Sequence, residues 1–275
     1  MPLPQALIFD VDGTLADNER HGHRVAFNQA FAAAGLNWHW SESFYGSLLK
    51  IGGGKERIAY YLDHHVLPHH VLPHHILHSA ESPLPPVLAD AGGDRRAIAD
   101  LIAQLHQSKQ QFYQHRLALG DIPLRPGVLR LLQAARAAGL RLAIATTSAL
   151  PSALALVEQA LPPGAVAWFE VIAAGDVVPQ KKPAPDIYRY VLDKLELGAA
   201  DCLVIEDSPV GLQAALAAGL ATIVTVNGYT EGAAFNGAKL VLSDLGEPER
   251  PFRRSPAPSR YRGSTPGSTL ICSAL

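Results

Sequence analysis

From residue 124 onward, short apolar runs alternate with longer segments whose apolar residues recur at helical spacing. The apolar runs predict strands at Leu140–Ala145, Phe169–Ala174, Cys202–Ile205 and Ala221–Val226, with an edge strand at Lys239–Leu242. The segments between them predict helices at 126–139, Pro151–Ala160, Pro185–Leu195 and Val210–Ala218. Strands that alternate with helices are typical of a parallel sheet whose faces are covered by helices.

The chain also begins with such a strand, Ala6–Phe9, but its pattern then changes until residue 120. Between residues 18 and 120 helical spacing predicts helices at Glu19–Gly35, Ser43–Leu49, Lys55–Leu62 and Arg95–Leu119. We therefore predict an α/β protein. Its Rossmann-like parallel sheet core, residues 1–17 and 121–245, is interrupted by an inserted helical cap domain, residues 18–120.

Two segments fall outside these patterns. The sequence His64-His65-Val66-Leu67-Pro68 is repeated at residues 69–73 and in part from residue 74, within a His-rich insert at 64–78. Proline at every fifth residue is incompatible with a regular helix. Paired histidines allow the binding of zinc, nickel or copper, but a tandem expansion in a tolerant surface loop also explains them. Residues 246–275 are rich in Pro, Ser, Arg and Gly and predict a disordered basic tail.

The composition limits the classes of partner. The chain has 275 residues, of which 48% are apolar, and a net charge of −2, so we expect it to bind neither nucleic acid nor a membrane. Its two cysteines, Cys202 and Cys272, provide no disulfide framework, and the N-terminus has no signal-peptide pattern. We expect a cytoplasmic monomer that acts on a small molecule.

Two carboxylates follow the first predicted strand. Asp10 and Asp12 come directly after Ala6–Phe9, and Gly13 permits the turn behind them. Such a pair would be costly inside a core, but at the end of a strand one carboxylate can attack phosphorus while the other moves protons. The alternative is a helix cap and a turn residue, which are the usual roles of Asp beside Gly.

Three further signals of this kind follow along the chain. They are the hydroxyl residues Thr146, Thr147 and Ser148 after one strand, Lys182 after the next, and Glu206 and Asp207 after the third. Because parallel sheets bind ligands beyond the carboxyl ends of their strands, we expect these residues in one site. Each also has an ordinary alternative, as a hydroxyl at a strand end, a solvated lysine or a helix-capping acid.

Together the four signals resemble the motifs of the haloacid dehalogenase-like hydrolase superfamily over residues 5–242. The resemblance implies that Asp10 is the nucleophile, which forms an aspartyl phosphate, and that Asp12 is the general acid and base. It implies that Thr146 and neighbouring backbone amides hold phosphoryl oxygens, while Lys182 neutralises charge. The inserted helices would be the cap that closes over the phosphate and selects the substrate.

The same resemblance implies a metal site. Its ligands would be Asp10, Asp207 and the main-chain carbonyl of Asp12, with Glu206 reaching the ion through water. Because these ligands are oxygen atoms and a phosphate is present, we expect Mg²⁺.

A closer resemblance is to the CbbY-like branch of this superfamily. It is carried by the stretches Asp17-Asn18-Glu19, His23-Arg24, Ala26-Phe27-Asn28 and Gly52-Gly53-Gly54-Lys55-Glu56-Arg57. The resemblance implies a phosphatase for sugar bisphosphates, with xylulose-1,5-bisphosphate, an inhibitor of Rubisco, as the substrate. It thereby implies a role in support of Rubisco and the Calvin cycle.

Several residues are candidates for binding that substrate. Gly53 and Gly54 would let the backbone approach an anion closely, and Lys55 and Arg57 would add positive charge for a second phosphate. The other candidates are Glu19 for sugar hydroxyls, Arg125 for the distal phosphate, and Thr147 and Ser148. A Gly-rich loop followed by charged residues also commonly begins an ordinary solvent-facing helix.

Two alternative functions stay open at this point. A β-phosphoglucomutase-like phosphotransferase shares the four motifs and differs in passing the phosphoryl group to a sugar hydroxyl instead of water. A His-rich metal-binding or scaffolding protein on an inactive hydrolase fold would have no phosphatase activity.

Overall fold

The computed structural model describes residues 3–51, 53–66 and 95–254, which divide into two compact units. We call residues 1–19 and 120–275 the sheet unit and residues 20–119 the helical unit. Each unit is described by itself.

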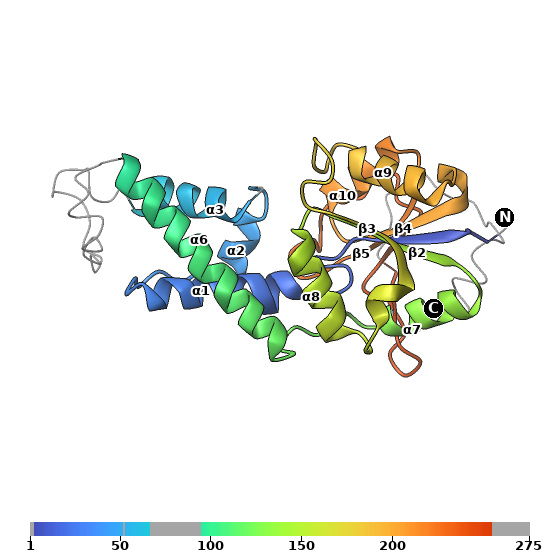
Figure 1. Cartoon of the computed structure of the whole chain (residues 1–275), viewed down its shortest axis with the longest axis horizontal. Coiled ribbons are helices and arrows are strands. Elements are labelled where there is room, and N and C mark those ends of the chain that lie inside the picture. The colour runs from blue at the N-terminus through green and yellow to red at the C-terminus, as the bar shows by residue number, and fades with distance from the viewer. Residues whose placement is uncertain (1–2, 52, 67–94, 255–275) are drawn as a thin grey trace. The chain divides into compact units, whose positions relative to one another are not determined.

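The sheet unit is built on one six-stranded parallel sheet with the order β3-β2-β1-β4-β5-β6 (Figure 1). Its strands are β1 (Ala6–Phe9), β2 (Arg141–Thr146), β3 (Phe169–Ala174), β4 (Cys202–Glu206), β5 (Ala221–Thr225) and β6 (Leu240–Leu242). The predicted parallel sheet and its short edge strand are confirmed. Because the strand order reverses at central β1, the crevice at its carboxyl end is where such a fold binds ligands.

Four helices connect the strands and cover the two faces of the sheet. They are α7 (Val128–Ala137), α8 (Leu150–Ala160), α9 (Asp186–Leu195) and α10 (Pro209–Ala217). In Figure 1, α9 and α10 lie on one face and α7 and α8 on the other. Short 3₁₀ turns at Ala165–Trp168 and Ala199–Asp201 precede β3 and β4.

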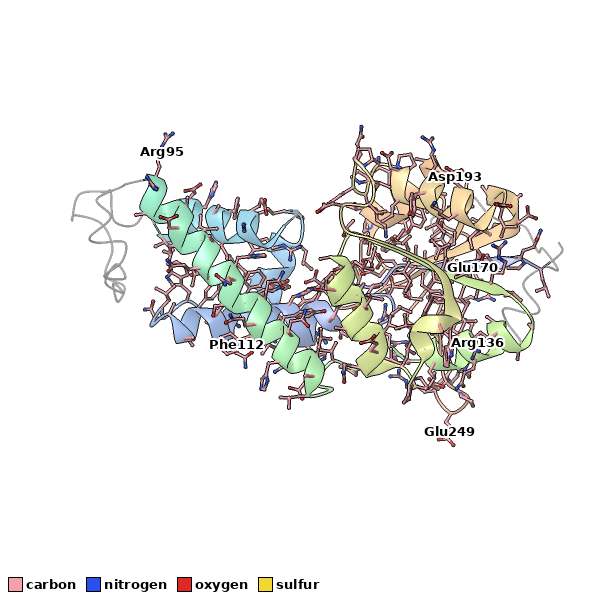
Figure 2. All side chains as sticks on the ribbon, viewed as in Figure 1. Arg95, Phe112, Arg136, Glu170, Asp193 and Glu249 are labelled. Atoms are coloured by element: carbon pink, nitrogen blue, oxygen red, sulfur yellow. The ribbon has the colours of Figure 1, made fainter. Side chains whose placement is uncertain are left out.

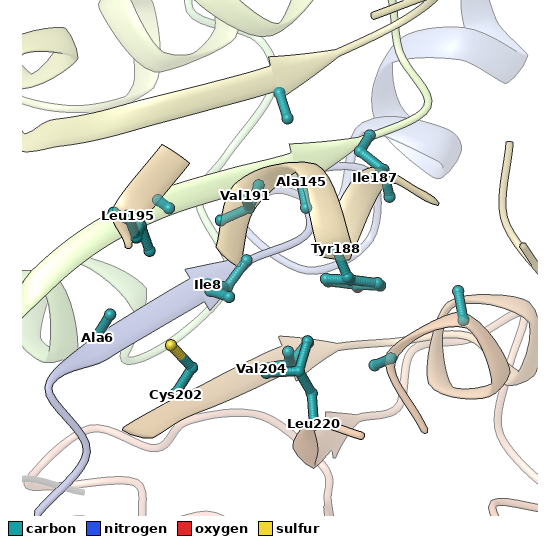
Figure 3. Close-up of a cluster of buried hydrophobic side chains, with 14 of the residues drawn as sticks. Ala6, Ile8, Ala145, Ile187, Tyr188, Val191, Leu195, Cys202, Val204 and Leu220 are labelled. Atoms are coloured by element: carbon teal, nitrogen blue, oxygen red, sulfur yellow. The ribbon is translucent and has the colours of Figure 1, made fainter. Parts of the chain in front are cut away.

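The buried face toward α9 shows why the strands alternate as they do. Ala6, Ile8 and Val204 point from β1 and β4 toward Tyr188 and Val191 of α9 (Figure 3). Successive strand residues point to opposite faces, and since helices cover both, nearly every strand position is apolar. The small residues in this layer let α9 approach the sheet closely.

The helical unit contains α1 (Arg24–Ala33), α2 (Glu42–Leu48), α3 (Gly54–Tyr61) and the long α6 (Arg95–Ala118), with a π-helical turn at Leu62–Val66. A second π-helical turn, Glu19–His23, begins on the last residue of the sheet unit's first segment. Helix α6 packs against α1 and α3. Aromatic rings dominate the interior: Trp40 lies 4.7 Å from Phe27 and 4.9 Å from Phe31, measured between ring centroids. Such offset and edge contacts add to the free energy of burying these large side chains.

The expectation of disorder from residue 246 onward is wrong for residues 247–254. The Glu247 carboxylate accepts a 2.6 Å hydrogen bond from the backbone N–H of Gly127, and Arg253 exchanges hydrogen bonds with Ser243. These contacts tie the segment to the sheet unit. Charged side chains at the surface of that unit, such as Asp193 and Glu249, point away from the ribbon (Figure 2). The rest of the tail lies outside the described residues.

Most of the His-rich insert, from residue 67, also lies outside the described residues. Its first two histidines are described, and their rings stack on tyrosines: His64 lies 4.0 Å from Tyr60 and His65 lies 5.5 Å from Tyr61. Across the part of the chain that the structure describes, no helix is long and apolar enough to span a bilayer.

Candidate active site

The carboxyl ends of adjacent strands bring the predicted acids together. Asp10 follows β1 directly, and its backbone N–H continues the sheet ladder with a 3.0 Å hydrogen bond to the carbonyl of Ile205. Glu206 is the last residue of β4, and Asp207 comes next. One oxygen from each acid lies within 4.8 Å of the others, and all three side chains are buried.

Lys182 reaches this acid group from the loop between β3 and α9. Its Nζ donates to Asp10 Oδ1 at 2.8 Å, to Glu206 Oε1 at 2.6 Å and to the carbonyl of Ala145 at 2.9 Å. The side chain is only 5% exposed. Removing one partner from such a buried ion pair costs about 3–5 kcal/mol, so the lysine is held firmly in place.

Glu206 is itself fixed by hydrogen bonds. Besides Lys182, its Oε1 accepts from the Tyr188 hydroxyl at 2.8 Å, and its Oε2 accepts from the backbone N–H of Asp207 and from Ser208. A side chain at Gly211, in the first turn of α10, would place its Cβ 1.9 Å from Oε1. The carboxylate of Glu206 therefore fits against the N-terminus of α10 only because residue 211 is a glycine.

Asp207 approaches the turn after β1. A Cβ on Gly13, whose φ is +87°, would lie 2.3 Å from Asp207 Oδ2, so both the backbone conformation and the space require glycine. Asn227, just after β5, donates to the same oxygen at 2.6 Å. Asn227 was missed by the sequence analysis, although it follows the apolar run Ala221–Val226 and the strand-end rule that selected the other residues applies to it.

Asp12 is half-buried and oriented by three side chains. Asn18 donates to its Oδ1, and Ser148 and Thr146 donate to its Oδ2 at 2.5 and 3.3 Å. The structure thus brings two of the predicted hydroxyl residues to Asp12, while Thr147 is exposed. A half-buried carboxylate held in this way, two residues after Asp10, is placed to pass a proton to a group bound beside Asp10.

The electrostatics of the acid group favour a cation. Burial raises the pKa of Asp10 to about 7, against the opposing charge of Lys182. Burial, Asp10 and Glu206 together raise the pKa of Asp207 well above its usual range. Burial lowers the pKa of Lys182, but the charges of Asp10 and Glu206 outweigh it and hold that pKa high. Three buried acids share one ammonium, and their oxygen atoms suit a hard divalent cation such as Mg²⁺.

Arg125 does not act as the sequence predicted. We expected its guanidinium to bind a distal phosphate, but it is 8% exposed and donates to main-chain carbonyls of Gly13, Thr225, Val226 and Ser243. Because these acceptors surround the planar group, it is held in the interior of the sheet unit. The prediction that Arg125 binds the distal phosphate of the substrate is therefore replaced by a role for Arg125 within the fold.

The glycine-rich loop of the helical unit has tight local packing. Gly53 has a φ of +98°, and a Cβ there would lie 2.0 Å from a carboxylate oxygen of Glu56. A Cβ on Gly54 would lie 2.8 Å from the ring of His106. Arg57 donates to the carbonyl of Ile51 and to the Tyr45 hydroxyl, both at 3.0 Å, and so braces the loop.

Of the remaining predicted substrate residues, Lys55 is exposed on the first turn of α3 and Glu19 is half-buried at the start of the first π-helical turn. Their roles toward a substrate stay predictions.

The helical unit also holds basic residues that the sequence analysis did not select. Lys109, on α6, is 5% exposed; its Nζ lies 2.9 Å from His23 Nδ1 and about 5 Å from the ring centres of Phe27 and Tyr113. Burial and the nearby charges of Lys109 and Lys55 lower the pKa of His106. No signal in the sequence distinguished Lys109 from the other polar residues of a long amphipathic helix.

Three comparisons with known proteins show what this chain is similar to. A sequence model of the haloacid dehalogenase-like hydrolases matches residues 4–219. The plasmid-encoded protein CbbY of Cupriavidus necator is 43% identical over 248 residues, which cover 90% of this chain and 88% of that protein.

Two solved structures of CbbY from Rhodobacter sphaeroides superpose with a TM-score of 0.68, and each comparison covers 88% of this chain and 95% of the other. One, bound to phosphate, is 41% identical to this chain, and the other, a mutant bound to xylulose-(1,5)bisphosphate, is 40% identical.

Proposed function

Because this chain belongs to the haloacid dehalogenase-like hydrolases and, within them, to the CbbY branch, we propose that it is a Mg²⁺-dependent phosphatase acting on xylulose-1,5-bisphosphate. The observation that carries the proposal is the convergence of Asp10, Lys182 and Asp207 in one buried group, with Asp12 beside it. The CbbY relative with that bisphosphate bound supports the choice of substrate. This activity would remove an inhibitor of Rubisco.

In the first half of the reaction, a carboxylate oxygen of Asp10 attacks phosphorus. Oδ1 is engaged by Lys182, which leaves the second oxygen for the attack. A phosphorus–oxygen bond forms to Asp10 while the bond to the sugar oxygen breaks, and protonated Asp12 gives its proton to the departing sugar oxygen. Positive charge from Lys182 would stabilise the extra negative charge on the phosphoryl oxygens.

In the second half, water replaces the sugar. The water attacks the phosphorus of the aspartyl phosphate while Asp12, now ionised, takes a proton from that water. The bond between phosphorus and Asp10 then breaks, which releases inorganic phosphate and restores the Asp10 carboxylate. The hydrogen bonds from Asn18 and Ser148 would keep Asp12 oriented through both steps. Thr146 lies beside it, and its hydroxyl could turn to a phosphoryl oxygen.

The divalent cation would be held by Asp10, Asp207 and the main-chain carbonyl of Asp12, with Glu206 interacting through water. When bound, Mg²⁺ would offset the negative charge that these acids and the phosphate bring together. Glu206 already accepts hydrogen bonds from Lys182 and Tyr188, so we assign it mainly to holding the lysine.

The second phosphate of the substrate would bind to the helical unit. Lys55, His23, His106 and Lys109 gather there with Glu56, beside the glycine-rich loop in which Gly53 is exposed. An anion near such a cluster gains charge-assisted hydrogen bonds, which are about twice as strong as neutral ones.

The test is phosphate release from a panel of substrates with the full chain and Mg²⁺. We expect xylulose-1,5-bisphosphate to give a higher kcat/KM than other sugar bisphosphates, sugar monophosphates and an aryl phosphate. Conversion of β-glucose-1-phosphate to glucose-6-phosphate without release of free phosphate would favour a phosphotransferase instead. The absence of turnover on every substrate would contradict the proposal as a whole.

A further inference from the structure

The side chain of Arg125 connects three separate segments of the sheet unit. One terminal nitrogen donates to the carbonyls of Gly13 and Thr225 and to the Thr225 hydroxyl, at 2.5–3.0 Å. The other donates to the carbonyls of Val226 and Ser243. All five acceptors are neutral oxygens, and the guanidinium is nearly removed from water.

Three acidic side chains of the sheet unit act on this buried cation, and one of them belongs to the acid group. Burial lowers the pKa of Arg125, while Asp207, Asp17 and Asp244 oppose that change, with Asp207 the strongest of the three. The guanidinium therefore lies within the field of Asp207 although its hydrogen bonds go to the main chain. An arginine can do this because its planar group offers five donors in fixed directions.

Two of the tethered segments are the ones that position Asp207. Gly13 approaches Asp207 Oδ2 so closely that a Cβ there would overlap it. Val226 immediately precedes Asn227, whose amide donates to the same oxygen. By binding the carbonyls of Gly13 and Val226, Arg125 thus fixes the turn beside Asp207 and the residue that precedes Asn227.

We infer that Arg125 is a positioning residue for the divalent cation site, acting by holding the Gly13 turn and the Asn227 loop against Asp207. This inference rests on the proposed function insofar as that function places a cation at Asp10 and Asp207. Groups that orient metal ligands without touching the metal typically affect metal affinity by about 10–100-fold.

The decisive variant is Arg125→Lys, which keeps the charge but loses the planar fork. We expect its Kd for Mg²⁺, measured by isothermal titration calorimetry on the full chain without substrate, to rise by about tenfold or more. In steady-state assays, the Mg²⁺ concentration for half-maximal rate should rise in parallel, whereas the KM for xylulose-1,5-bisphosphate at saturating Mg²⁺ should change little.

Arg130→Lys is the matched control. Arg130 also donates to main-chain carbonyls of the sheet unit, those of Leu245 and Gly246 at 2.8 Å, but its acceptors do not adjoin Asp207. The control should lose some thermal stability and keep Mg²⁺ affinity within about twofold, since neither of its acceptors belongs to the Gly13 turn or the Asn227 loop.

Equal Mg²⁺ affinity in Arg125→Lys and the unmodified chain, or equal weakening in both arginine variants, would overturn the inference and leave Arg125 as a fold element only. If Arg125→Lys does not fold, Asn227→Ala carries the test: unchanged Mg²⁺ affinity in that variant would overturn the link from this loop to the cation. An unmodified chain that binds no Mg²⁺ would instead refute the cation site of the proposed function, and this inference with it.

Discussion

A buried lysine has different surroundings in the sheet unit and in the helical unit. In the sheet unit, the Lys182 ammonium lies 2.6 and 2.8 Å from carboxylate oxygens of two buried acids. In the helical unit, the equally buried Lys109 lies against a histidine and two aromatic rings, with other basic groups nearby. Three acids surround one ammonium in the first arrangement, which suits a cation, whereas in the second Lys55, Lys109, His23 and Glu56 all act on His106.

We propose that this difference separates the chemistry of the reaction from the choice of substrate. The sheet unit draws its candidate catalytic residues from the ends of several strands, where the hydrogen-bond ladder fixes their spacing. The helical unit presents its basic residues from helix faces and a glycine-rich loop. We therefore expect changes in the sheet unit to affect every substrate alike, and changes in the helical unit to affect only substrates with a second phosphate.

Asp10→Asn should have the largest effect and should not distinguish between substrates. The amide cannot attack phosphorus, so kcat should fall by at least about a thousandfold for both a bisphosphate and an aryl phosphate. Phosphate release measures the activity, and circular dichroism checks the fold. The control is Asp193→Asn, at an exposed position on α9, which should keep full activity. Substantial activity in Asp10→Asn would remove Asp10 as the nucleophile.

The pH dependence of Mg²⁺ binding tests whether the buried acids of the sheet unit hold protons in the absence of a cation. Burial raises the pKa of Asp10 to about 7 from 3.8, so without a cation the folded chain retains a proton that the unfolded chain loses. The contribution of this group to stability therefore declines as pH rises from about 4 to about 7, and then stays constant.

Since a cation requires the ionised carboxylate, its binding should release a proton below pH 7. Because Asp10 and Asp207 must both lose their protons, we expect the affinity for Mg²⁺ to rise by at least about tenfold per pH unit from pH 5 to 7, measured by calorimetry in buffers of different ionisation enthalpy. The increase in Tm on adding Mg²⁺ should likewise be larger at pH 8 than at pH 6. An affinity that does not change over this range would show that Asp10 is already ionised.

Lys55→Ala should have the smallest effect on activity, and that effect should differ most between a bisphosphate and an aryl phosphate. Loss of one charge-assisted hydrogen bond to a second phosphate should lower kcat/KM for xylulose-1,5-bisphosphate by about tenfold and leave an aryl phosphate within about twofold. Lys50→Ala, at an exposed position in the same unit, is the control and should change neither. Equal losses on both substrates would mean that Lys55 supports the fold or general catalysis rather than substrate choice.

The periodicity of the sequence was sufficient to predict the parallel sheet and much of the acid group. Each apolar run became a strand within one or two residues of its predicted bounds, such as β2 at Arg141–Thr146. Because parallel strands end at a common edge, attention to the polar residues directly after each run placed Asp10, Glu206 and Asp207 near one another. Lys182 lies further from its strand and was selected through the family resemblance. The helical insertion was equally visible, because its spacing differs from that of the strands.

The partner of each polar side chain could not be predicted from the sequence, and the tertiary structure settled it for Arg125, Tyr188 and Asn227. An arginine before a helix looks the same whether it reaches a ligand or turns inward to main-chain carbonyls. Spacing along the chain fixes where a residue lies on its own strand or helix. A hydrogen bond depends on distances of a few tenths of an ångström between segments about a hundred residues apart, which only the packed fold determines.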